Sequence, residues 1–158
     1  MNPIKNETEF SEALQSLDLA QQREVAVAFV NHVLHLCEDT RVSHALRTAG
    51  ERDALEDELS AALKSARAAT FDCHARCGAE GNWTDQAGYF VARAAVAAIT
   101  PGEHSRQGGP AWQAAMSARM AYTSMLIEDV SNHLKAHAET EWQYRALSDY
   151  LNANPESN

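Results

Sequence analysis

Apolar positions between residues 110 and 138 recur at steps of three and four, which is the period of an α-helix. One face of this segment carries mostly alanine, and a second face carries methionine and branched aliphatic residues. A helix that is apolar on two sides packs on both of them, so we expect this one at the centre of the fold. The chain enters it through Gly108, Gly109 and Pro110, and a proline at the first helical position loses no hydrogen bond.

The same period predicts helices along the rest of the chain, and no β-type alternation interrupts them. These helices span residues 8–17, 19–37, 41–49, 55–78, 85–99 and 141–152. The sequence therefore predicts an all-α, single-domain, alanine-rich helical bundle of about six to seven helices around the long central helix 110–138.

Several polar residues stand where helices are expected to begin. Asp18 with Gln21, and Thr140 with Gln143, have the spacing of a capping box, in which two side chains satisfy unpaired N–H groups reciprocally. Thr84 is expected to cap the helix 85–99, and Gly50 is expected to follow the end of the helix 41–49.

The length of 158 residues suits one domain that covers residues 1–158, with residues 1–6 and 153–158 expected to fray. Alanine supplies roughly a sixth of the chain, which is well above its ordinary share. Because alanine is small, it lets helix axes approach closely, and we expect the core to depend on that closeness.

The chain carries 22 acidic and 13 basic residues, for a net charge of −9. This charge argues against nonspecific binding to nucleic acid or to anionic membranes, since both need a basic surface. Three cysteines make an odd set without a disulfide pattern, and the chain shows no signal-peptide core or membrane-spanning run. We therefore expect a cytoplasmic protein with no membrane contact.

The best candidate metal ligands are His133 and His137, which lie four residues apart on one face of the predicted central helix. A third ligand would come from elsewhere, and the candidates are His32, His35, His44, Cys37 and the segment from Cys73 to Cys77. This arrangement resembles the DinB-type metal-binding four-helix bundles, and it implies one divalent transition metal. The alternative is that both histidines are exposed side chains without a cofactor.

Other catalytic motifs are weaker. Cys73 and Cys77 are one residue further apart than a Cys-x-x-Cys pair, and both fall on the apolar line of their helix, so we interpret them as buried structural thiols. The sequence contains no Glu-x-x-His pair for a di-iron centre, no glycine-rich phosphate loop and no nucleophile elbow.

Two tryptophans, Trp83 and Trp112, stand at junctions between loops and helices. An aromatic ring there either closes the end of a bundle or anchors a partner. If both flank one open edge together with His104 and Arg106, that edge is the preferred recognition surface. The acidic run Glu56, Asp57 and Glu58 is the second candidate contact, for a basic partner.

The middle of the chain also shows alanine-rich segments in a particular order. They are Val33-Leu34-His35-Leu36-Cys37-Glu38, Ala66-Arg67-Ala68-Ala69-Thr70, Val91-Ala92-Arg93-Ala94-Ala95 and Ala114-Ala115-Met116-Ser117-Ala118-Arg119-Met120-Ala121-Tyr122. Together they resemble the alanine-rich helical immunity proteins of bacterial polymorphic-toxin systems. The resemblance implies a noncatalytic protein that binds and blocks a cognate toxin.

The sequence leaves three functional hypotheses. The first is a noncatalytic cytoplasmic protein-binding domain with a protein partner, immunity-like and without a cofactor. The second is a metal-binding helical bundle that uses His133 and His137. The third is a structural domain in which apolar helices bury a homodimer interface.

Overall fold

Seven α-helices and two short 3₁₀ helices form the described part of the computed structural model, which covers residues 3–80, 83–126, 135 and 137–155. The helices are α1 (Glu7–Gln15), α2 (Leu19–Val33), η1 (Leu34–Leu36), α3 (Thr40–Ala49), α4 (Glu56–Glu80), α5 (Trp83–Ile99), η2 (Gly102–His104), α6 (Gly109–Leu126) and α7 (Ala138–Ala153). No strand occurs among these residues, and the all-α prediction is confirmed.

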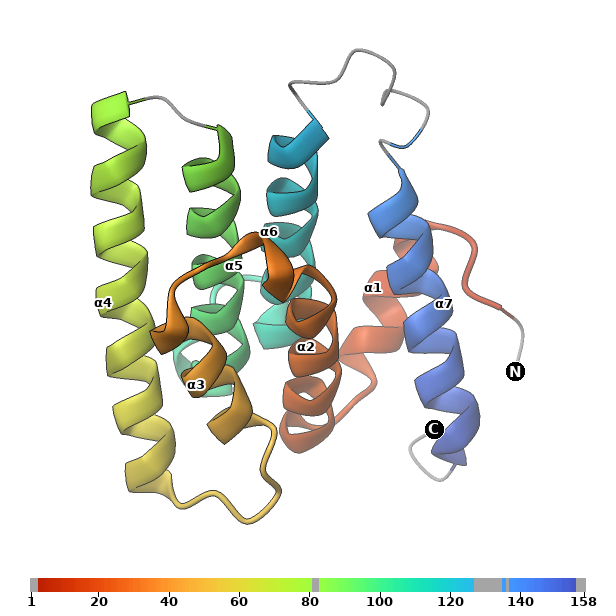
Figure 1. The fold of residues 1–158 in the computed structure, drawn as a ribbon. Helices are drawn as coiled ribbons and strands as arrows, with labels where there is room; N and C mark the ends of the chain where they lie inside the picture. The colour runs from red at the N-terminus through yellow and green to blue at the C-terminus, as the bar shows by residue number, and fades with distance from the viewer. Residues whose placement is uncertain (1–2, 81–82, 127–134, 136, 156–158) are drawn as a thin grey trace.

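Helices α4, α5, α6 and α7 stand side by side in Figure 1, with α2 and α3 in front of them. Helix α5 packs on α2, α3, α4 and α6, while α6 packs on α1, α2, α5 and α7. The predicted central position of α6 is therefore confirmed, and α5 shares it.

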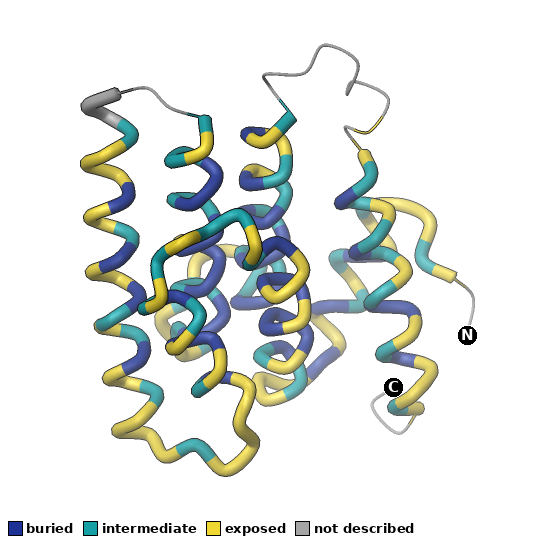
Figure 2. Tube along the Cα trace, in the orientation of Figure 1, coloured by how far each residue is buried: buried dark blue, intermediate teal, exposed yellow. Residues whose placement is uncertain are grey.

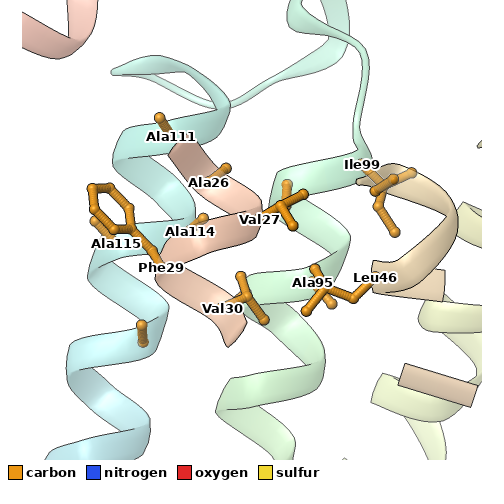
Figure 3. Close-up of a cluster of buried hydrophobic side chains, with 14 of the residues drawn as sticks. Ala26, Val27, Phe29, Val30, Leu46, Ala95, Ile99, Ala111, Ala114 and Ala115 are labelled. Carbon is orange, nitrogen blue, oxygen red and sulfur yellow. The ribbon is translucent and has the colours of Figure 1, made fainter. Parts of the chain in front are cut away.

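Helices α5 and α6 pack on each other, and most of the buried residues of both helices are alanine. The alanines that are at most 1 % exposed are Ala92, Ala94, Ala95, Ala98, Ala111, Ala114, Ala115, Ala118 and Ala121. Larger side chains from α2 and α3, including Phe29, Val30 and Leu46, cover these alanines (Figure 3). Figure 2 shows the buried positions turned towards the inside of the bundle along each helix. Close backbone approach between α5 and α6 thus forms the centre of the core.

Local hydrogen bonds explain where three of the helices begin. Asp18 accepts from the Gln21 backbone N–H at 2.8 Å, and the Gln21 side chain accepts from the Asp18 backbone N–H at 3.0 Å, so the predicted capping box is present. Asn6 caps α1 and Asp39 caps α3, each by accepting a backbone N–H from the first turn.

Several predicted boundaries are wrong. Helix α5 begins at Trp83, so Thr84 lies inside its first turn. Helix α7 begins at Ala138, so Thr140 also lies inside a helix. The predicted end of α3 before Gly50 is confirmed, but Gly50 has a φ of −79°, which is right-handed and makes no special demand on glycine.

The predicted helix 110–138 is also too long at its end. The described helix α6 stops at Leu126, and His137 lies in a turn directly before α7. Residues 127–134 lie outside the described residues. At its start, α6 is entered through Gly108 and Gly109 with φ values of 93° and 89°, a conformation that favours glycine.

None of the helices that the structure describes is both long and apolar enough to cross a membrane.

Candidate functional site

The largest concave region that we describe lies at one end of the bundle, and we call it the apolar hollow. It has a volume of about 510 Å³ and is bounded by the start of α2, the first half of α4 and the loop that follows α5. Its lining consists of Leu19, Ala20, Arg23, Glu56, Leu59, Ser60, Leu63, Ala98, Ile99, Thr100, Pro101, Gly102, Glu103, His104 and Pro110. Most of these side chains are apolar, so the hollow suits an apolar group.

Leu19 is the most unusual residue of this hollow because 58 % of its surface is exposed. It lies against Gly102 in the loop: a Cβ atom built on Gly102 would come within 2.4 Å of the Leu19 Cδ2 atom. The missing side chain at position 102 therefore leaves room for Leu19 at the edge of the hollow.

The predicted acidic run begins with Glu56 at the edge of the apolar hollow, and we call these three residues the acidic rim. Glu56, Asp57 and Glu58 form the exposed first turn of α4, and the Glu58 side chain accepts a hydrogen bond from the Leu55 N–H at 3.0 Å. Negative charge at this position also interacts favourably with the helix dipole. Glu56 lines the hollow itself, together with Glu103 from the loop.

A second concave region lies on the other side of the same loop, and we call it the arginine cleft. It has a volume of about 240 Å³ and lies between α4, α5, α6 and the loop. Its lining consists of Arg67, Arg93, Val96, Ala97, Thr100, His104, Ser105, Arg106, Gln113 and Ser117. His104 and Thr100 line both regions, so the loop separates two hollows of different character.

The predicted recognition residues are only partly brought together. His104 lines both hollows, Arg106 lines the arginine cleft and Glu56 lines the apolar hollow. The sequence analysis did not select Arg67 or Arg93, which face the same cleft from α4 and α5. Arg93 had one signal, since it is the only charged residue of α5 beyond its first turn.

The two tryptophans do not flank one edge. Trp83 is the first residue of α5 and lines a hollow of about 300 Å³ with Met125 at the end of α6. Trp112 lies in the first turn of α6, where its ring is 6.2 Å from the Phe10 ring. Because α5 and α6 run antiparallel (Figure 1), these positions are at opposite ends of the helix pair. The hypothesis that both tryptophans flank one open edge is therefore wrong, and Trp112 packs against the core instead.

A buried polar network connects α7 to three other helices. Arg119 on α6 donates to the Gln143 Oε1 atom at 2.8 Å and to the Glu7 Oε1 atom at 2.6 Å. Its guanidinium carbon lies 5.2 Å from the centre of the Phe10 ring, within the range of a cation–π contact. Gln143 also donates to the Ala115 carbonyl at 3.1 Å, so its amide serves tertiary packing and the predicted cap with Thr140 is absent.

Glu139 extends this network to α2. It is only 2 % exposed, and its Oε2 atom lies 2.8 Å from the His32 Nδ1 atom, while the His32 ring stacks on Trp142 at 3.6 Å. Burial raises the pKa of the Glu139 carboxyl above its ordinary value of 4.5, against the opposing influence of His32 and of hydrogen bonds from His32 and Gln143. Neither Glu139 nor His32 lines a described hollow, so the contact holds α7 in place.

The metal prediction gains no support from the described residues. His133 lies outside them, and His137 is exposed in the turn before α7. Within residues 3–80, 83–126, 135 and 137–155, no three potential ligands lie close enough together to hold a metal ion. The predicted metal site at His133 and His137 stays a prediction.

The three cysteines are free thiols. Cys73 is buried, and Cys37 and Cys77 are half-buried. Desolvation raises the pKa of each of the three thiols, which keeps them protonated and poorly nucleophilic. This agrees with the interpretation of Cys73 and Cys77 as structural residues.

Comparison of the chain with protein-family models, curated proteins and solved structures gives no match. The function is therefore argued from the geometry of the two hollows.

Proposed function

We propose that the chain is a noncatalytic protein-binding domain whose contact surface is the apolar hollow with its acidic rim. The observation that carries this proposal is Leu19, a large apolar side chain left 58 % exposed at the edge of a hollow of about 510 Å³. Contiguous apolar surface with a polar rim marks sites of protein association, and Leu19 continues the apolar lining of the hollow at its edge.

The partner that fits this surface is a basic protein that inserts an apolar side chain. The acidic rim of the hollow consists of Glu56, Asp57 and Glu58. The chain as a whole carries a net charge of −9. A basic partner is attracted over long range by this charge and is then held by apolar burial. In line with the resemblance to immunity proteins, the proposed partner is a toxin that is blocked by binding in the cytoplasm.

The test compares two exposed leucines. Leu19 is 58 % exposed in the hollow, and Leu55 is 66 % exposed but does not line it. The partner is first captured on the immobilised chain from cells that express it, identified by mass spectrometry and purified. We then expect Leu19→Asp to weaken its binding at least about tenfold, as for an interface hot spot, while Leu55→Asp leaves the affinity unchanged.

The charge of the rim is tested by a second variant. Glu56→Lys should slow association with the purified partner, and added salt should reduce the difference between this variant and the natural chain. Equal loss of affinity with Leu55→Asp and Leu19→Asp would contradict the proposed surface. Failure to capture any protein after cross-linking in the expressing cells would contradict the proposed function.

A further inference from the structure

The arginine cleft gathers positive charge in an acidic protein. Arg67 from α4, Arg93 from α5 and Arg106 from the loop all line it, together with His104. No aspartate or glutamate belongs to its lining, although the chain has 22 acidic and 13 basic residues. Three like charges in one cleft repel each other, and a bound anion relieves that repulsion.

These three arginines are also without ionic partners in the part of the chain that the structure describes. Arg41, Arg52 and Arg119 each lie within 4.0 Å of a carboxylate, whereas Arg67, Arg93 and Arg106 do not. Their guanidinium groups therefore have free donors, and a guanidinium offers paired N–H groups that match the oxygen atoms of a phosphate.

A hydroxyl in the wall of the cleft points to the same ligand chemistry. Ser117 lines the cleft and is only 8 % exposed, yet its hydroxyl makes no hydrogen bond to any described residue. Other buried serines bond back to their own helix: Ser124 donates to the Met120 carbonyl at 2.9 Å, and Ser148 donates to the Tyr144 carbonyl at 2.8 Å. Ser117 thus retains a donor for a group in the cleft.

An aromatic surface continues directly from the cleft, and we call it the aromatic shelf. It consists of Phe71, His74 and Tyr89, and it lines a shallow hollow of about 300 Å³ that shares Arg67, Arg93 and Val96 with the cleft. Phe71 is 75 % exposed, and the rings of His74 and Tyr89 lie 5.2 Å apart.

The helical period explains why the two regions adjoin. Phe71 follows Arg67 by one helical turn on α4, and Tyr89 precedes Arg93 by one turn on α5. Since α4 and α5 pack side by side (Figure 1), both pairs line the same shallow hollow.

From this juxtaposition we propose that the arginine cleft and the aromatic shelf together bind a nucleoside phosphate. The phosphate groups lie in the cleft against Arg67, Arg93 and Arg106, and the flat base lies on Phe71 and its neighbours. Exposed aromatic rings accept any base by stacking, and arginine binds phosphate oxygens in pairs. The net charge of −9 disfavours a polymer of many phosphates, so the ligand is a single nucleotide.

Calorimetric titration of the full chain at constant ionic strength tests the proposal with ADP, pyrophosphate and adenosine as probes. We expect ADP to bind more tightly than pyrophosphate and adenosine to bind weakest. Arg93→Gln should lower the ADP affinity about tenfold or more, because a hydrogen bond between charged groups contributes that factor. Phe71→Ala should lower the affinity for ADP towards that for pyrophosphate.

Arg47→Gln is the matched control, since Arg47 is an exposed arginine on α3 that lines neither region. It removes the same charge and should leave ADP binding unchanged. Leu19→Asp should also leave it unchanged, which separates this site from the proposed protein-binding surface.

Three results would overturn the proposal. They are no heat of binding with ADP at millimolar concentration, equal loss of affinity with Arg47→Gln and Arg93→Gln, or equal affinity for ADP and pyrophosphate. All the replaced side chains are exposed, so we expect each variant to keep its helices. Circular dichroism of each variant measures this.

Discussion

Two carboxyl groups of the network under α7 respond to their surroundings in opposite directions. Burial raises the pKa of Glu139. Burial acts the same way on Glu7, but hydrogen bonds from Arg119 and Tyr144, with the charge of Arg119, outweigh it and lower the pKa of Glu7. The difference follows from position: Glu7 is 43 % exposed beside a guanidinium, whereas Glu139 is 2 % exposed beside a histidine.

The raised pKa of Glu139 has a measurable consequence for stability. A carboxyl whose pKa is higher in the folded state favours folding at low pH, and this contribution is lost as the pH rises from 4.5 through the folded value. We therefore expect the natural chain to lose stability relative to Glu139→Gln over that pH range. Urea unfolding of both proteins from pH 4 upward measures the difference. A difference that changed in the opposite direction would show that the pairing with His32 outweighs burial.

At the scale of the helices, periodicity was sufficient to predict nearly every element. The largely apolar helix α5 and the alanine face of α6 pack where the pattern predicts, because the apolar positions of a helix determine which of its faces is buried. Helix starts were harder to predict. Thr140 and Gln143 have the spacing of a capping box, but the Gln143 side chain forms hydrogen bonds with Arg119 and Ala115 on α6. These contacts depend on the tertiary fold, so residue spacing within one helix does not predict them.

The candidate sites show the same limit. His104 and Arg106 were found because they lie in a loop, where polar side chains are exposed and available for binding. Arg67 and Arg93 come together only because α4 and α5 pack side by side. That juxtaposition is a property of the tertiary fold, and the spacing of residues along one sequence does not predict it.

The alanine contact between α5 and α6 predicts the cost of adding volume. Ala118 is fully buried in this contact, so Ala118→Leu should overpack it and lower the free energy of unfolding by about 1–3 kcal/mol. Ala68→Leu on the exposed side of α4 is the control, and it should change stability by less than about 0.5 kcal/mol. Urea denaturation of the two variants gives the comparison, and equal effects would mean that the α5–α6 contact tolerates larger side chains.

At the scale of the whole molecule, the two proposed binding surfaces and the attachment of α7 lie in different places. Both hollows and the aromatic shelf involve α4 or the loop after α5, whereas α7 packs on α6 and α2 at the other side of the bundle (Figure 1). Helix α7 is held by the polar network of Arg119, Gln143, Glu139 and His32 and by the buried side chains of Leu147 and Leu151. Because α7 lies at the edge of the bundle (Figure 1), we expect it to open independently of the α4–α5–α6 unit.

Hydrogen exchange measures this independence. Arg119→Gln removes the charged donor to Gln143 on α7, so the amides of α7 (Ala138–Ala153) should exchange about tenfold faster or more. The amides of α5 should keep their protection, and Arg145→Gln, an exposed change on α7, should have no effect. Faster exchange throughout the protein in Arg119→Gln would instead show that the helices unfold as one unit.

Gly102 lies next to Leu19 at the edge of the apolar hollow and outside the core. The three atoms nearest to a methyl group at this position all belong to the Leu19 side chain, so that exposed side chain would have to move. The shape of the proposed protein-binding surface is thus adjustable by a single carbon atom outside the core. On the proposed function, variation at this one codon would change which protein the chain accepts while its helices stay as they are.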